Sequence, residues 1–166
     1  IPYLASGFLL WNFISTMFNE GCTVFTQAEG IIKQVDAPYS VHVYRLIWRN
    51  LVILAHNAVV FVAVAVIFTL PIGWNILMLI PGLAVFLLNS LWVALTFGLF
   101  AARFRDVAPI VASILQISFF MTPIIWKPEI LETRAVYLEL NPFWHVIETV
   151  RAPLLGQPVA EIHWIV

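Results

Sequence analysis

Residues 76–102, ILMLIPGLAVFLLNSLWVALTFGLFAA, form an apolar run that contains no Asp, Glu, Lys or Arg. A helix needs about 20 mostly apolar residues to cross the hydrocarbon of a bilayer. Residues 51–70 and 107–126 reach this length and are equally free of charge, and residues 1–18 nearly reach it. The sequence therefore predicts an all-α membrane protein, a polytopic transmembrane helical bundle with four spans.

The composition agrees with a chain that is dissolved in lipid. Hydrophobic residues make up 62% of the sequence and charged residues 10%, whereas a soluble domain has about 25% charged residues. The net charge is −1, so no basic surface favours nucleic acid as a partner. The single cysteine, Cys22, excludes an intramolecular disulfide, and we interpret it as a structural residue.

Both ends of the sequence resemble interior parts of a membrane domain. The chain begins inside an apolar run, without a Met or a basic flank. Its last residues, HWIV at 163–166, are typical of the start of another span. We therefore expect residues 1–166 to be a single transmembrane domain that is truncated at both ends. The predicted spans are residues 1–18, 51–70, 76–102 and 107–126.

The basic residues are divided unequally between the two sides of this predicted bundle. Residues 20–50 and 103–106 share one side, which carries Lys33, Arg45, Arg49, Arg103 and Arg105. The other side carries Lys127, Arg134 and Arg151, which are outnumbered there by glutamates. Because Lys and Arg favour the cytoplasmic side of a membrane, we expect residues 20–50 to be cytoplasmic and residues 128–156 to be external.

Residues 20–50 contain a short amphipathic segment. Its apolar residues recur at helical spacing: Val24, Ala28, Ile31 and Val35. The residue before a proline avoids the helical region, so we expect this helix to end at Ala37-Pro38. A helix over residues 24–35 can either lie flat among lipid headgroups or dock onto a partner.

Residues 128–156 predict two short helices, separated by Asn141-Pro142. The first presents an apolar face made by Leu131, Ala135 and Leu138. The second presents one made by Phe143, Val146, Ile147 and Val150. We expect the polar residues of the second helix to point away from that face: His145, Glu148 and Thr149. Each segment has about ten residues and is too short to span, so we expect a re-entrant hairpin in the outer leaflet.

Three motifs resemble a known family. Residues 141–156, NPFWHVIETVRAPLLG, resemble the segment before the last span of type-2 ABC exporter permeases, above all those that export O-antigen and related polysaccharides. RFRDV at 103–107, followed by MTPIIW at 121–126, is similar to the same family in the same order. GIIK at 30–33 is followed by Pro38, as in the family. The sequence departs from the family pattern at Ala37, where Phe is common, and at Glu29-Gly30, where Asn is frequent.

The resemblance implies a six-span permease in the bacterial inner membrane that forms a homodimer, with each half bound to a nucleotide-binding ATPase subunit. Residues 24–35 would resemble the coupling helix, with contacts to the ATPase from Gln27, Glu29, Gly30, Ile31, Ile32 and Lys33. The outer hairpin would form gate helices, with a gate region comprising Trp126, Tyr137, Phe143, Trp144, Glu148 and Arg151. Three of these, Trp126, Tyr137 and Trp144, could equally be interfacial anchors.

No glycine-rich phosphate-binding loop ending in Gly-Lys-Ser/Thr is present in the sequence. ATP and Mg are therefore expected on the partner subunit, and no catalytic residue, metal ligand or cofactor is assigned to this chain.

Two stripes of polar and aromatic residues could line a transport path. One stripe in the third run consists of Asn89, Trp92, Thr96 and Phe100. Another in the fourth run consists of Ser113, Gln116 and Phe120. Sugars need such partners because an unsatisfied hydroxyl in an apolar channel costs several kcal/mol. The alternative interpretation is helix–helix packing through interhelical hydrogen bonds.

Other polar residues have alternative interpretations. His56 and Asn57 could form a proton relay, but their shallow position favours an interhelical contact. His145 and Glu148 lie one helical turn apart, as two metal ligands could, but no third ligand is close in the sequence. We therefore interpret Glu148 as a surface partner of Arg151, and we hypothesise that this pair holds the gate helix in place.

The leading functional hypothesis is ATP-driven export of a lipid-linked polysaccharide. Teichoic acid or small hydrophobic compounds are alternative cargoes within the same class. A membrane-embedded lipid-sugar transferase is less favoured because the acidic residues are scattered, without an Asp-x-Asp pair. A secondary transporter is disfavoured because the runs contain no acidic or basic residue near their midpoints.

Overall fold

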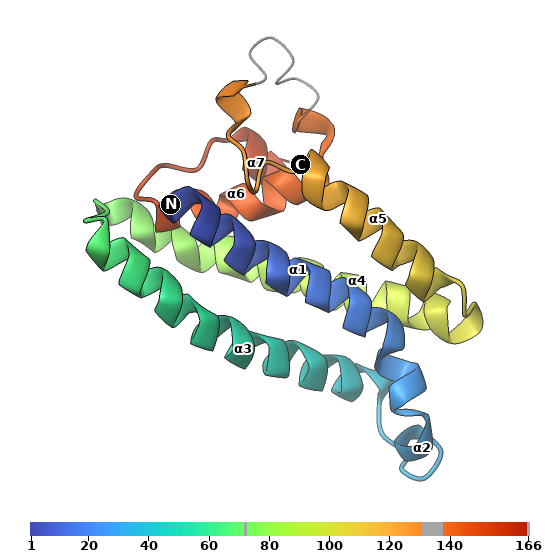
Figure 1. Ribbon diagram of the computed structural model, residues 1–166. Coiled ribbons are helices and arrows are strands. Elements are labelled where there is room, and N and C mark those ends of the chain that lie inside the picture. The colour runs from blue at the N-terminus through green and yellow to red at the C-terminus, as the bar shows by residue number, and fades with distance from the viewer. Residues whose placement is uncertain (72, 131–137, 166) are drawn as a thin grey trace.

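The computed structural model describes residues 1–71, 73–130 and 138–165 (Figure 1). Within these residues the chain is helical and has no strand, which confirms the all-helical prediction for this part of the molecule. The elements, in chain order, are α1 (Pro2–Gln27), α2 (Glu29–Ile32), α3 (Tyr39–Ile67), η1 (Trp74–Met78), α4 (Leu79–Arg103), α5 (Val107–Met121), α6 (Pro142–Leu154) and α7 (Ile162–Ile165).

Helix α1 is the centre of the bundle. It contacts α3, α4, α5 and α6, and in Figure 1 it runs between α3 and α5 with α4 alongside. Helices α6 and α7 gather at one end of the bundle, and α2 projects from the other end. The core cluster includes Leu10, Met17, Phe86, Ala94 and Ile147, which α1, α4 and α6 contribute.

The end of α1 differs from the sequence prediction. The first run was expected to end at residue 18 and to be followed by a separate helix over residues 24–35. Instead α1 continues to Gln27, Ala28 is a break, and only Glu29–Ile32 forms a further helical turn. Close packing explains the extension, because a Cβ placed on Gly98 of α4 would lie 2.9 Å from Val24 and Phe25 side-chain atoms. The prediction of one amphipathic helix over 24–35 is therefore wrong.

Helix α3 begins directly after Pro38, well before the apolar run at 51–70. Much of the predicted cytoplasmic connection is therefore helical, and only residues 33–38 separate α2 from α3. Helix α5, in contrast, ends at Met121, before the predicted limit at residue 126. Pro123 explains this end because the preceding residue, Thr122, adopts an extended conformation.

Two helical segments of the described chain are long and apolar enough to cross a membrane, Tyr39–Ile67 and Trp74–Arg103. Helix α5 is a shorter apolar helix. Helix α3 exposes many large apolar residues along its length, among them Val52, Val59, Val62 and Val66. An exposed apolar face of this length is what a membrane helix presents to lipid.

Candidate functional sites

The predicted coupling residues form a small exposed turn at one end of the bundle. Gln27, Glu29, Gly30, Ile31 and Lys33 are exposed, and Ile32 is half-buried. Lys33 Nζ donates a hydrogen bond to Glu29 Oε1 at 2.5 Å. This hydrogen bond and the positive charge of Lys33 lower the pKa of Glu29 below its ordinary value. The turn thus offers an apolar tip, Ile31, beside one solvated ion pair.

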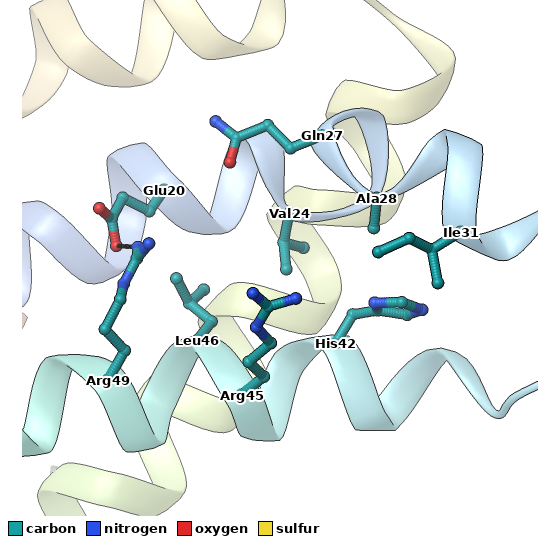
Figure 2. A pocket seen from close by; sticks show the side chains of 9 residues that line it. All are labelled: Glu20, Val24, Gln27, Ala28, Ile31, His42, Arg45, Leu46 and Arg49. Carbon is teal, nitrogen blue, oxygen red and sulfur yellow. Dashed lines mark hydrogen bonds and ion pairs between the residues drawn. The ribbon is translucent and has the colours of Figure 1, made fainter.

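A polar cavity of about 350 Å³ lies between this turn, the end of α1 and the start of α3 (Figure 2). Glu20 of α1 forms an ion pair with Arg49 of α3 and accepts a hydrogen bond from Asn50 Nδ2 at 2.8 Å. Arg45 and His42 of α3 also line the cavity. Sequence analysis placed the two arginines on the cytoplasmic side but did not predict the cavity, which depends on the extension of α1.

The two predicted channel-lining stripes are not buried in the core. Six of the seven residues are exposed and Thr96 is half-buried. Two of their polar groups bond to their own helix, since Asn89 Nδ2 donates to the Val85 carbonyl at 3.0 Å and Ser113 Oγ to the Pro109 carbonyl at 3.0 Å. The packing interpretation requires interhelical hydrogen bonds. Within the described residues these two side chains make none.

Residues from both stripes line hollows beside α1. Asn89 and Trp92 line a cavity of about 300 Å³ between α1, α4 and α6. Gln116 and Phe120 line another of about 330 Å³ between α1 and α5, together with Ser15. These two hollows therefore lie on either side of one face of α1.

An aromatic row connects these two hollows. Trp11 of α1 lies 5.8 Å from Phe119 of α5 and 5.5 Å from Phe143 of α6, measured between ring centroids. Phe18 of α1 lies 5.7 Å from Phe143 and 5.2 Å from Phe97 of α4. Sequence analysis did not single out this face of α1. The spacing of Trp11, Ser15, Phe18 and Asn19 at helical intervals was a usable signal for it.

At the other end of the bundle, a single arginine of α6 joins three parts of the chain. Arg151 is completely buried and forms an ion pair with Glu148. Its Nη1 donates to the Pro123 carbonyl at 2.7 Å, and its guanidinium lies 4.0 Å from the ring centroid of Tyr3. Tyr3 also donates from its hydroxyl to the Pro123 carbonyl at 2.9 Å. We call these four residues, Tyr3, Pro123, Glu148 and Arg151, the Arg151 clamp.

The clamp corrects one prediction about α6. The Glu148–Arg151 pair was expected at the surface, but Arg151 is fully buried and Glu148 nearly so. The sequence spacing identified the pair, but it could not show that α1 and the segment after α5 cover it.

His145 and Thr149 were also expected to point away from the apolar face, and both are buried. His145 Nε2 lies 2.8 Å from the Glu139 carbonyl and its Nδ1 lies 2.9 Å from His163 Nδ1. Both sides of α6 are covered because it packs against α4 and also contacts α7, while Glu139 and His163 contact His145. In the described ranges no three His, Cys, Asp or Glu side chains are grouped as a metal site.

The remaining gate residues lie around this end. Trp126 is half-buried and its indole donates to the Phe120 carbonyl at 3.2 Å. Trp144 is half-buried and donates to Glu148 Oε1 at 3.2 Å. Tyr137 lies outside the described residues, as does most of the first predicted outer helix.

The polar pair in the second predicted span lies on α3. His56 is exposed and Asn57 is half-buried. Asn57 faces a small cavity of about 70 Å³ that Asn12 and Asn50 also line. Because these polar side chains are amides and the described lining contains no acidic residue, the cavity fits an interhelical contact better than a proton relay.

Comparison with known proteins gives one family. Residues 1–155 match the family described as ABC-2 type transporter. No curated protein matches the chain. The match extends over all the elements described above except α7.

Proposed function

We propose, from the premise that this chain belongs to the ABC-2 type transporter family, that it forms the membrane-spanning half of an exporter for a lipid-linked polysaccharide. Membership makes the chain a transporter membrane component. Such a component works with an ATPase partner and usually in a dimeric assembly. The cargo, the inner-membrane location and the site residues are our proposals.

One observation carries the choice of cargo, namely the face of α1 that the two stripes flank. The two hollows beside this face combine aromatic rings such as Trp11 and Trp92 with amides such as Asn19 and Gln116. Aromatic faces pack against sugar rings, and amides replace the hydrogen bonds that hydroxyls lose when they leave water. The resemblance of residues 141–156 to polysaccharide exporters supports the same cargo.

The exposed turn around α2 is the proposed contact with the ATPase. Its residues make few contacts with the rest of the chain, so a cleft in a partner could surround Ile31 without disrupting the bundle. The Arg151 clamp, at the opposite end, is proposed to hold α6 as part of the gate. The proposed contact with the ATPase and the proposed exit gate therefore lie at opposite ends of the bundle.

The cargo proposal can be tested by export in cells that carry the full-length permease and its ATPase. Trp92→Leu and Gln116→Leu should each slow polysaccharide export by about tenfold, the cost of about one hydrogen bond or stacking contact. Trp74→Leu is the matched control, because Trp74 is also an exposed tryptophan of the same span but lies outside both hollows. Equal slowing in Trp74→Leu would contradict the proposal.

Small hydrophobic compounds are the second candidate cargo, because the cavity that Ile14, Met17 and Phe143 line is almost wholly apolar. The same variants separate the two cargoes. A hydrophobic cargo would not lose export in Gln116→Leu, because the amide contributes nothing to its binding. Teichoic acid, in contrast, would behave like the polysaccharide and must be distinguished by identifying the exported polymer.

The coupling proposal is tested by co-purification with the ATPase. Ile31→Ser should reduce the coupling of ATP hydrolysis to export while leaving the thermal stability of the permease unchanged, since Ile31 is 47% exposed. Val41→Ser, at a similarly exposed apolar residue near the start of α3, serves as the control and should leave the coupling unchanged. Unchanged coupling in Ile31→Ser would remove α2 from the proposed interface.

A further inference from the structure

The polar cavity shown in Figure 2 has an excess of positive charge. Of the charged residues that line it, Glu20 is already bonded to both Arg49 and Asn50. Arg45 has no ion-pair partner among the described residues. Figure 2 shows its guanidinium extending from α3 toward Val24, while His42, three residues earlier on α3, extends toward Ile31. Arg45 is exposed, so its uncompensated guanidinium is accessible to an anion that enters the cavity, and a guanidinium is a strong donor to phosphate oxygens.

A second, independent observation concerns His42. This side chain lines the cavity and is only 9% exposed. Its Nε2 is buried and has no hydrogen-bond partner within the described part of the chain. Such an atom costs free energy unless a partner satisfies it, so an unpartnered ring nitrogen beside an unpaired arginine points to a missing acceptor.

The position of the cavity along α3 indicates where this acceptor comes from. Arg45 lies less than two turns before the apolar run that starts at Leu51. Tyr44 and Trp48, on the same part of α3, are exposed. Tyrosine and tryptophan gather at the headgroup level of a membrane, and basic residues there attract anionic lipids. The cavity therefore lies at headgroup depth.

We propose that this cavity binds the phosphate of an anionic phospholipid from the leaflet on the α2 side of the membrane. Arg45 supplies a guanidinium to the phosphate oxygens, and the ring of His42, whose Nε2 is buried and unpartnered among the described residues of the lipid-free chain, turns toward the cavity to donate to the same group. A free phosphate ion offers the same chemistry, so the test below separates the two sources. The inference depends on the chain being a membrane protein and is independent of the cargo.

The experiment uses the full-length permease, purified with its ATPase in detergent and titrated while its thermal unfolding is followed. The probes are phosphatidylglycerol, phosphatidylcholine and inorganic phosphate. Phosphatidylglycerol should bind, and Arg45→Gln should weaken this binding by about tenfold or more. Arg103→Gln is the matched control because Arg103 is an exposed arginine at the same end of the bundle, outside the cavity. Its affinity for phosphatidylglycerol should be that of the unmodified protein.

Three results would overturn the proposal. Equal weakening in Arg45→Gln and Arg103→Gln would show general surface electrostatics instead of a site. Equal affinity for phosphatidylcholine would show that the negative charge of the lipid is irrelevant. Inorganic phosphate that binds as tightly as the lipid, with the same dependence on Arg45, would assign the site to a soluble anion.

A second variant keeps the test decisive if Arg45→Gln disturbs the fold. His42→Phe preserves an aromatic ring of similar size and removes the unpartnered nitrogen. It should leave the lipid-free protein as stable as before, or more stable, because a buried unsatisfied group disappears. Its affinity for phosphatidylglycerol should nevertheless fall several-fold. A loss of stability without any loss of affinity would show that His42 is a packing residue only.

Discussion

Each end of the bundle carries an ion pair between neighbouring turns of the chain, but the two pairs differ in their surroundings. Lys33 and Glu29 have side chains that are 71% and 63% exposed, whereas Arg151 and Glu148 are 0% and 14% exposed. An exposed pair contributes little to stability. A buried pair costs desolvation, but breaking it leaves an uncompensated charge. The same sequence spacing therefore gives a loose turn at one end and a fixed junction at the other.

The largest expected effect comes from breaking the buried pair. Arg151→Ala should lower the free energy of unfolding by about 3–5 kcal/mol, because Glu148 would remain buried without its partner. Thermal unfolding in detergent measures this effect, and export should be lost at normal protein level. Arg151→Ala together with Glu148→Gln should recover part of the stability. Persistent export by the single variant would show that the clamp does not hold the gate.

A smaller effect is expected where α4 meets α6. A Cβ on Gly82 would overlap with the Thr149 carbonyl oxygen, which is backbone and cannot rotate away. Gly82→Ala should therefore lower the free energy of unfolding by about 1–3 kcal/mol, as overpacking usually does. Urea or thermal unfolding of the purified protein would measure it. A neutral result would mean that α6 can shift, and the contrast between the two ends would weaken.

A glycine-to-alanine substitution in the exposed α2 turn should have the opposite effect on stability. A Cβ on Gly30 would meet nothing within 4 Å. Gly30→Ala should stabilise the α2 turn by at most about 1 kcal/mol, through the higher helix propensity of alanine. Amide hydrogen exchange over residues 28–34 is the sensitive measurement. Faster exchange in the variant would indicate that the glycine has a conformational role that its open surroundings do not reveal.

The smallest expected effect concerns the exposed pair. Lys33 lowers the pKa of Glu29. The stabilisation of the turn by this pair is therefore complete at pH values above the ordinary pKa of a glutamate, and it is lost as the pH falls through the lowered pKa of Glu29. Lys33→Ala should return the pKa of Glu29 toward its ordinary value without a measurable change in the unfolding midpoint at neutral pH. A carboxyl titration followed by NMR checks the pKa. A large loss of stability would mean that the pair is shielded by a partner.

Local sequence signals predicted much of the fold, and helix α6 shows why. Pro142 suits the first helical turn, and Asn141 caps the helix by accepting a hydrogen bond from the Phe143 amide at 3.0 Å. These are contacts between neighbours in the chain, so the sequence contains them. The family motifs and the apolar runs could be located in the same way, because each is a continuous stretch of the sequence.

Long-range packing decided what the sequence analysis missed. The extension of α1 to Gln27 depends on Gly21 and Gly98, which let α1 and α4 approach closely. The sequence around either glycine does not show which residue packs against it. The burial of Arg151 likewise depends on Tyr3 and Pro123, which are distant in the chain. A charged residue on a short amphipathic helix is usually placed at the surface, and only the tertiary contacts reverse that expectation.

The Arg151 clamp also constrains how the molecule is made. Tyr3 lies near the beginning of the described chain and Arg151 near its end, so a nascent polypeptide emerging from the ribosome cannot close the clamp until α6 has been synthesised. Until then, Tyr3 and the Pro123 carbonyl, which also bond to each other directly, lack the cation that contacts both of them. A chain that stops before α6 would therefore enter the bilayer with this junction open.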